Sequence, residues 1–362
     1  MRSEWVPAPR SLAVAPVSNL HPGNLNRLTN SARGTLESLH ACSLSTVAKM
    51  ARQSLLILIC GMTVSGCQQA SNPAEAPMAA TVHESVVVTS QPLLEMAQTI
   101  VRPQFELIRI VPHGTSSLDW NPTAQDVRAL QKARVILING AGYEPWRDRV
   151  SLPASRLKDT ASGYYDQFIR IPDAVKHQHG PDGLHSHPGT VWATWLDPNL
   201  AMAQLSQVTA SLVRLAPDEK ATIELESAKL RAQFEGLNSL VDELAAVPGI
   251  AECAIVSDGP YYQYLTNRLG CRLTYLHWPL SGDLSEKDLQ ELTTTLSDLP
   301  AVPSRIFLHG NRNLGGAKEQ LIAAGFRIVS IDLCEQSDEQ SKPFVERMRM
   351  NLDRLKAALT AQ

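Results

Sequence analysis

The chain has 362 residues, of which 44% are hydrophobic and 19% are charged, and it carries a formal net charge of −3 with a pI near 6.4. A chain of this length has room for about two domains, each with its own buried core. The nearly balanced charge, without any basic run interleaved with aromatic residues, argues against a nucleic-acid partner.

Residues 1–84 are predicted to precede the folded part. The first 49 residues show no hydrophobic period and are interpreted as a mis-assigned start or a disordered extension. In 50–66, Arg52 precedes an apolar stretch of about ten residues, shorter than the roughly 20 that span a membrane, which predicts an export signal. The following VSGC resembles a bacterial lipobox, so Cys67 is the predicted lipid attachment site and 67–84 the predicted tether. The alternative is a buried apolar helix that happens to contain a cysteine.

Three cysteines remain after the predicted leader and the lipid-bearing position are set aside: Cys253, Cys271 and Cys334. An oxidising compartment permits one disulfide among them, and the sequence does not select the pair. Their spacing is too wide for a zinc-thiolate motif, so we interpret them first as small buried hydrophobic residues.

Strands and helices alternate in the first lobe, residues 85–200. In chain order we predict a strand at 85–90, a helix at 91–101, a strand at 105–112, a helix at 123–133 and a strand at 134–140. This alternation is typical of a parallel sheet covered by helices on both faces.

Linking helices are predicted for residues 201–247, including one uninterrupted helix over 218–247. At 1.5 Å per residue such a helix is about 45 Å long and resists bending. A second α/β lobe follows at 248–362. Its predicted strands are 252–258, 272–278, 305–310 and 327–333, and its predicted helices are 261–270, 285–298 and 316–325. The predicted fold class is therefore α/β, with two parallel-sheet lobes joined by one long spine helix.

Four segments in this order resemble the substrate-binding lipoproteins of zinc and manganese ABC transporters (the ZnuA-like family). They are RIVPHGTSSLDWNPT…YEPW at 109–146, TWLDPNLAMAQ at 194–204, SDGPYYQYLTNRLG at 257–270 and FRIVSIDL at 326–333. The likeness covers about residues 85–358, and the export signal and lipobox agree with it. It implies two lobes around a metal-binding cleft.

The metal site of this chain departs from the family pattern. The resemblance implies three histidines, or two and a glutamate, plus one aspartate. At the first three positions this chain has Leu118, Ala193 and Gly259, and only Asp332 is retained. One carboxylate cannot hold a zinc ion, which takes about four ligands.

Carboxylates beside the lost positions offer a substitute. Asp119 and Asp258 could converge with Asp332 at the strand ends and suit a hard ion such as Mn²⁺ or Ca²⁺. The alternative interpretation is that Asp119 and Asp258 are turn or helix-capping residues.

The segment 176–188, KHQHGPDGLHSHP, holds four of the ten histidines: His177, His179, His185 and His187. The family inserts a His-rich loop in this part of the first lobe. Imidazole is a good zinc ligand, so the loop is predicted to bind metal weakly and pH-dependently, either collecting ions or supplying donors to the cleft. Because of its glycines and prolines we expect no regular structure there. The alternative is a solvated loop without a ligand.

Other signals are weaker. His277 and His309 lie at predicted strand ends, and we interpret both as structural histidines, with metal ligation as the alternative. The glycine-rich HGNRNLGG at 309–316 lacks the Lys-Ser/Thr ending of a P-loop. The chain has no G-x-S-x-G elbow and no dinucleotide fingerprint, so we do not expect an enzyme.

The sequence thus predicts an exported, lipid-anchored, monomeric protein facing the periplasm or cell exterior, which delivers Zn²⁺ or Mn²⁺ to an ABC permease in the inner membrane. The alternative is a paralogue that has lost metal capture and acts as a binding or scaffold module in the cell envelope.

Overall fold

The computed structural model describes residues 84–171, 176–178, 184–186, 189–278, 283–299, 301–302, 304–310, 312–337 and 340–360. The predicted leader, Cys67 and all but the last residue of the tether therefore lie outside the described residues. In the part that is described, none of the helices combines the length and the apolar character needed to cross a membrane.

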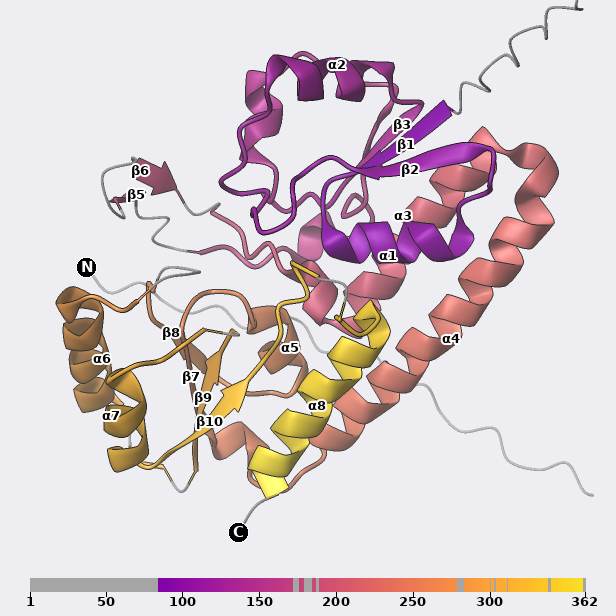
Figure 1. Ribbon diagram of the computed structural model, residues 1–362. Coiled ribbons are helices and arrows are strands. Elements are labelled where there is room, and N and C mark those ends of the chain that lie inside the picture. The colour runs from indigo at the N-terminus through magenta and orange to yellow at the C-terminus, as the bar shows by residue number, and fades with distance from the viewer. Residues whose placement is uncertain are drawn as a thin grey trace, which may run out of the picture. The chain divides into compact units, whose positions relative to one another are not determined.

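The N-terminal lobe is a parallel sheet in the order β2-β1-β3-β4 (Figure 1). Its strands and helices are β1 (Glu84–Val88), α1 (Gln91–Ile100), β2 (Phe105–Arg109), α2 (Ala124–Lys132), β3 (Val135–Ile138) and β4 (Leu157–Asp159). Ser90 caps α1 by accepting from the Leu93 N–H, and Thr123 with Asp126 forms a capping box that starts α2.

Alternate residues of β1 serve the two faces of this sheet, as the two-residue period of a strand requires. Val86 and Val88 pack in the same core as Leu93 of α1. Val87 faces the opposite core, with Leu130 of α2. Both faces are thus covered, which explains the uninterrupted apolar run of β1.

The C-terminal lobe repeats this plan with a parallel sheet in the order β10-β9-β7-β8. Its elements are β7 (Ala254–Ser257), α5 (Gln263–Arg268), β8 (Leu273–Tyr275), α6 (Glu286–Asp298), β9 (Arg305–His309), α7 (Ala317–Ala323) and β10 (Phe326–Ser330). Phe307 of β9 packs on the α6 and α7 side. Its neighbour Leu308 faces the other core.

Two helices connect the lobes along the chain, α3 (Pro198–Leu215) and α4 (Lys220–Ala245), and the C-terminal helix α8 (Phe344–Thr360) packs against α4 and β10. The 26 residues of α4 span about 39 Å, and Figure 1 shows this helix running beside both lobes. A single hydrophobic cluster contains Val86 of β1, Phe234 of α4, Leu308 of β9 and Leu352 of α8. The lobes therefore share one core.

The predicted fold class is confirmed: both sheets are parallel and a long helix joins the lobes. The strand β4 and the helix α8 were not predicted. The expectation that 176–188 has no regular structure was wrong for its described residues, because β5 (Lys176–Gln178) pairs antiparallel with β6 (Leu184–Ser186). The residue types between these strands, Gly-Pro-Asp-Gly at 180–183, are those that favour a hairpin turn.

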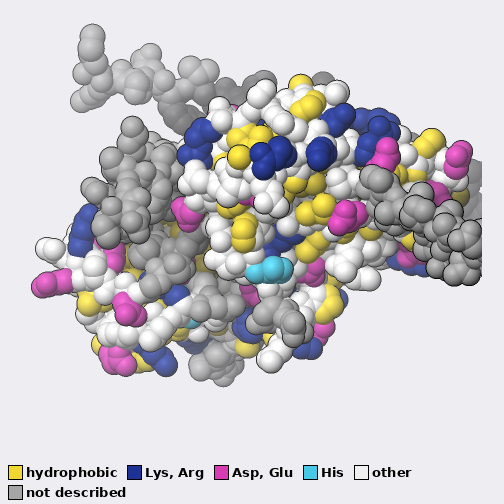
Figure 2. All heavy atoms as spheres, turned by 45° about the horizontal axis from the view of Figure 1, so that its top comes forward, with side chains coloured by type: hydrophobic (Ala, Val, Ile, Leu, Met, Phe, Trp, Pro, Cys, Tyr) yellow, Lys and Arg dark blue, Asp and Glu magenta, His cyan; other side chains and the backbone are white. Residues whose placement is uncertain are grey.

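Surface charge is mixed. On the face drawn in Figure 2, Lys and Arg side chains occur among Asp and Glu side chains and uncharged residues. This distribution agrees with the small net charge of −3.

Candidate functional site

Four positions correspond to the metal ligands that the resemblance implies, and they follow strands or precede a helix on both lobes. Leu118 lies in the loop after β2, and Ala193 precedes the 3-10 helix η3 (Thr194–Leu196). Gly259 follows β7 and Asp332 follows β10. Leu118 packs against the shared core and Ala193 is fully buried within it, so the structure uses these two positions for packing.

Gly259 has a neighbour that explains the absence of a side chain. A Cβ built on Gly259 would lie 2.2 Å from the Cε2 and 2.6 Å from the hydroxyl oxygen of Tyr261. Such contacts are far inside van der Waals distance. The ring of Tyr261 thus occupies the space into which a ligand side chain at 259 would project.

Tyr261 belongs to a buried aromatic cluster that contains residues of both lobes. The ring of Trp192 lies 5.5 Å from Tyr261, 5.0 Å from Tyr143 and 5.4 Å from Trp195, measured between centroids. Each of the four side chains is at most 2% exposed. The space between the lobes is filled here by ring packing, which stabilises through area burial and edge-to-face contact.

Glu335 is a buried carboxyl group that the sequence reasoning missed. It accepts hydrogen bonds from the Ser116 hydroxyl and, at 2.7 Å, from the Tyr143 hydroxyl, both on the N-terminal lobe. Burial raises its pKa, the two hydroxyl donors oppose this rise, and the charge of Asp119 adds to it. The carboxyl group joins the lobes, and the sequence offered no signal for it because its partners are more than 190 positions away.

Asp332, the position at which the resemblance implies a retained carboxylate ligand, is bound to helix α8. Its Oδ1 accepts from the Cys334 N–H at 2.8 Å, and its Oδ2 lies 3.5 Å from Nη1 of Arg347. Arg347 also pairs with Glu95 of α1 at 2.8 Å. The Asp332 carboxylate thus forms part of an ion-pair network between the lobes.

The two substitute carboxylates differ in their surroundings. Asp258 is 4% exposed, and its oxygens accept from the Tyr262 hydroxyl at 3.1 Å and the Gly310 N–H at 2.9 Å. Burial raises its pKa to about 6 against the opposing effect of these bonds. Asp119 is exposed on the loop after β2. Among the residues that the structure describes, no three His, Cys, Asp or Glu side chains form a group able to hold a metal ion.

The histidines fall into two groups. Nδ1 of His277 lies 2.8 Å from Oε1 of Glu291 on α6, a contact consistent with the structural role. His309 ends β9, and burial lowers its pKa. In the hairpin, His177 and His185 occupy directly opposite positions of β5 and β6. His179 and His187 lie outside the described residues.

The cysteines Cys253, Cys271 and Cys334 are buried and free. This agrees with their interpretation as small apolar residues, and burial raises the pKa of all three thiols.

Comparison with known proteins gives one consistent result. The family model described as "ZnuA: Zinc-uptake complex component A periplasmic" matches residues 86–358. The high-affinity zinc uptake system protein ZnuA of Bacillus subtilis (strain 168) is 23% identical over 321 residues, which cover 84% of this chain and 96% of that protein. The manganese ABC transporter substrate-binding lipoprotein PsaA of Streptococcus pneumoniae is 20% identical over 294 residues, covering 76% and 88%.

Solved structures show the same fold. The metal-dependent lipoprotein YcdH from Bacillus subtilis superimposes with a TM-score of 0.62 at 19% identity, covering 77% of this chain and 100% of that one. The Zn(II)-bound ZnuA-like domain of Streptococcus pneumoniae AdcA gives 0.61 at 17% identity, covering 77% and 99%.

Proposed function

Since the chain belongs to the ZnuA family of periplasmic zinc-uptake components, a transport family and not one of enzymes, we propose that it delivers Zn²⁺ or Mn²⁺ to an ABC permease. The protein would be exported, anchored to the membrane through lipid on Cys67, and monomeric. The observation that carries this proposal is the family match over residues 86–358, which spans both lobes and the linking helices.

Metal capture in this proposal begins at the histidine hairpin. The register places His177 opposite His185, so two imidazole-bearing residues are neighbours across a pair of strands. With His179 and His187, the hairpin supplies the nitrogen donors that zinc prefers. Asp119, Asp258 and Asp332 are the carboxylates proposed to complete the coordination, and of these Asp119 is the exposed one.

A second function is favoured by the packing around Gly259. The Tyr261 ring lies where a side chain at 259 would project, and the resemblance implies a metal ligand at that position. This supports the alternative that the chain is a paralogue without ion capture, working as a binding or scaffold module in the cell envelope.

Isothermal titration calorimetry separates the two functions. Metal-free protein comprising residues 68–362 is titrated with Zn²⁺ and, separately, with Mn²⁺. Delivery of metal requires saturable heat with at least one ion. If neither ion gives saturable heat, the proposal of metal import is rejected and the proposal of a binding or scaffold module is kept.

The same titration locates the ligands. Replacing His177, His179, His185 and His187 together by Ser is expected to abolish most of the Zn²⁺ affinity, whereas Asp332→Ala is expected to change it less, because Asp332 is already paired with Arg347. Unchanged Zn²⁺ affinity in the quadruple variant would show that the hairpin takes no part in metal binding.

A further inference from the structure

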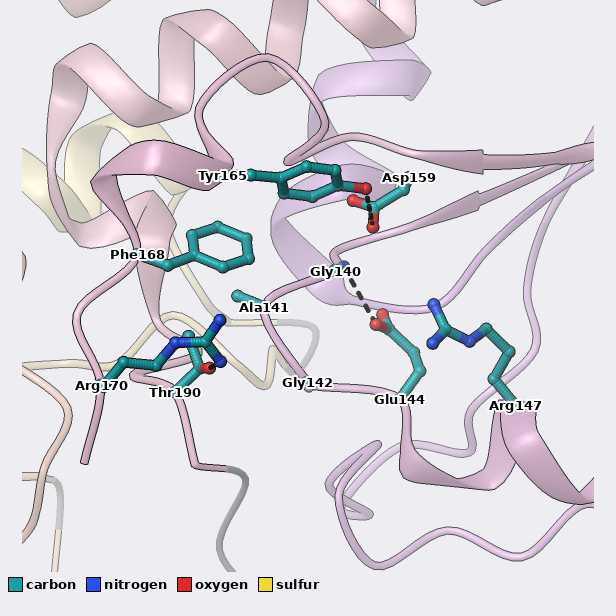
Figure 3. A pocket seen from close by; sticks show the side chains of 10 residues that line it. All are labelled: Gly140, Ala141, Gly142, Glu144, Arg147, Asp159, Tyr165, Phe168, Arg170 and Thr190. Atoms are coloured by element: carbon teal, nitrogen blue, oxygen red, sulfur yellow. Dashed lines mark hydrogen bonds between the residues drawn. The ribbon is translucent and has the colours of Figure 1, made fainter. Parts of the chain in front are cut away.

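A cavity of about 500 Å³ opens on the N-terminal lobe, beside the carboxyl ends of β3 and β4 (Figure 3). Ligands of parallel α/β sheets bind at this edge, and small-molecule sites have volumes of about 300 to 1,000 Å³. Arg147 and Glu144 lie on one side of the cavity, and Phe168 and Arg170 on the other. Neither metal import nor the scaffold function uses this cavity.

The loop between β3 and Glu144 builds one wall in an unusual conformation. Gly140, Ala141 and Gly142 have φ values of 78°, 53° and 79°, so three consecutive residues are left-handed. For Ala141 this costs energy, and such strain is concentrated at ligand sites. A Cβ on Gly140 would lie 2.1 Å from an Asp159 carboxylate oxygen, which shows how closely the loop approaches β4.

The acceptor groups of the cavity are already engaged. Glu144 accepts from the Thr89 hydroxyl at 2.6 Å and from the N–H groups of Asn139 and Gly140 at 2.7 and 3.0 Å. Asp159 accepts from the Ala161 N–H at 2.9 Å and from the Tyr165 hydroxyl at 2.8 Å. These carboxylates hold the loops in place: Glu144 uses three, and Asp159 two, of the roughly four acceptor positions of a carboxylate.

The donor groups are not engaged to the same extent. A guanidinium has five N–H donors. Among the described residues, Arg147 bonds through Nε to Asp148, whose side chain is 78% exposed, and Arg170 bonds through Nη1 to the Thr190 hydroxyl at 3.0 Å. The guanidinium groups of Arg147 and Arg170 therefore keep N–H donors and positive charge that a ligand can use. A carboxylate is the group that matches them.

An aromatic pair supplies the apolar surface. The rings of Tyr165 and Phe168 are 5.3 Å apart in an edge-to-face arrangement, and Tyr165 is 53% exposed. In Figure 3 the two rings lie near each other among the residues that line the cavity. A flat apolar ligand would cover surface that is otherwise in contact with water.

We propose that this cavity is a second binding site, which takes a small organic anion with a flat apolar body. Arg147 and Arg170 bind its carboxylate groups, and Phe168 and Tyr165 contact its body. The site is independent of metal capture, because no candidate metal ligand lines it.

Calorimetric titration of the purified protein with phthalate tests this site. Metal is removed first, and the chelator is then dialysed away because it also carries carboxylates. Saturable binding of phthalate is expected below about 1 mM, and inorganic phosphate, which lacks the apolar body, is expected to bind at least about tenfold more weakly. Arg147→Gln and Arg170→Gln are each expected to lower phthalate affinity about tenfold or more.

Arg149→Gln is the matched control, since Arg149 is exposed in the same 3-10 helix, η1 (Pro145–Arg149), but does not line the cavity. It should bind phthalate like the unchanged protein. Three results would overturn the site: no saturable heat with phthalate, equal affinity for phosphate and phthalate, or unchanged affinity in both Gln variants of Arg147 and Arg170. Unfolding midpoints of the variants show that they are folded. The outcome does not depend on whether Zn²⁺ or Mn²⁺ binds.

Discussion

Tyr261 and Gly259 constrain each other sterically, because the ring at 261 leaves no room for a side chain at 259. A side chain at 259 requires the ring to leave, and the ring is held by Trp192 at 5.5 Å and by Tyr262 at 5.9 Å between centroids. Placing a metal-ligating side chain at 259 would therefore require a rearrangement of the aromatic cluster as well as a substitution.

Gly259→Ala is predicted to destabilise the protein by about 1 to 3 kcal/mol, because the added methyl group overlaps the Tyr261 ring. Urea unfolding monitored by circular dichroism measures the change. Gly316→Ala is the control, since a Cβ on Gly316 meets no atom within 4 Å and its φ is −67°. Equal effects of the two substitutions would contradict the steric explanation.

Asp258 makes the stability depend on pH. Burial raises its pKa from the ordinary 3.8 to about 6, so the folded state holds this proton more tightly than the unfolded state. Its contribution to stability is fully present below pH 3.8 and is lost as the pH rises through about 6.

Asp258→Asn is therefore predicted to match the unchanged protein near pH 4 and to exceed its unfolding free energy at pH 8 by on the order of 2 to 3 kcal/mol. The amide fits, because it can accept from the Gly310 N–H and donate to the Tyr262 hydroxyl oxygen. Denaturant unfolding at both pH values measures this, and a difference independent of pH would contradict it.

At the residue scale, the sequence motifs indicated which positions to consider as metal ligands, but they did not predict which side chains contact one another. The resemblance implies a loss of donors at 118, 193 and 259, which stays a prediction, because those residues stand beside recognisable motif neighbours. The burial of Glu335 was not readable, since its environment is assembled from Ser116 and Tyr143 of the other lobe. Nothing local to the sequence distinguishes such a carboxyl group from a solvated one.

Helices and strands could be predicted wherever the hydrophobic periodicity was clear or a helix-capping residue was present. Buried strands such as β3 and capped helices such as α2 agree with their predicted ranges to within a few residues. The strand β4 was missed because Leu157–Asp159 is three residues long and half-buried, so it has neither an apolar run nor an alternation. The paired strands β5 and β6 were missed because the glycines and the proline in the sequence between them were taken as breakers of regular structure.

Two of the three cysteines lie just before neighbouring strands of one sheet. Cys253 directly precedes β7, and Cys271 lies two residues before β8, which pairs with β7 in parallel. The charge of Cys253 contributes to the raised pKa of the Cys271 thiol, which places the two thiols near each other. Neighbouring strands lie about 4.8 Å apart, within the range of about 4.4 to 6.8 Å that a disulfide spans between Cα atoms.

Mild oxidation is predicted to join Cys253 to Cys271 and to leave Cys334 free. The reaction should be slow near pH 7, because burial, and then the charge of Cys253, raises the pKa of the Cys271 thiol to about 12 and thiolate is the reactive form. Mass spectrometry of unreduced peptides identifies the linkage. Cys334→Ser should give the same linkage, and any bridge that includes Cys334 would contradict the assignment.

At the scale of the whole molecule, the lobes are joined by more than the linking helix. The Tyr143 hydroxyl donates to Glu335 across the lobes, Trp195 donates to the Leu333 carbonyl oxygen at 2.8 Å, and Arg347 reaches Glu95. Together with the shared core, these contacts favour small relative motions of the lobes. The sequence predicted two lobes and a stiff connection, but the extent of their contact depends on side chains that meet only after folding.

Tyr143→Phe is predicted to lower the unfolding free energy by about 1 to 3 kcal/mol, because the buried Glu335 carboxyl group loses a donor. The comparison is Tyr165→Phe, which removes an exposed hydroxyl bond to Asp159 and should cost less than about 0.5 kcal/mol. Urea titration measures the unfolding free energy of both variants. An equal decrease in the two would show that the hydrogen bond between the lobes stabilises the protein no more than the exposed one.

The hydrophobic cluster that runs through β1, α4, β9 and α8 has a consequence for any attempt to divide the protein. Cutting the chain between its sheets would expose apolar surface on each fragment, so neither half should keep its native shape alone. Heating should accordingly give one endotherm for the described part of the chain, because both halves melt together. A mutation that is selected for its effect on one half should therefore also change the solubility of the other half.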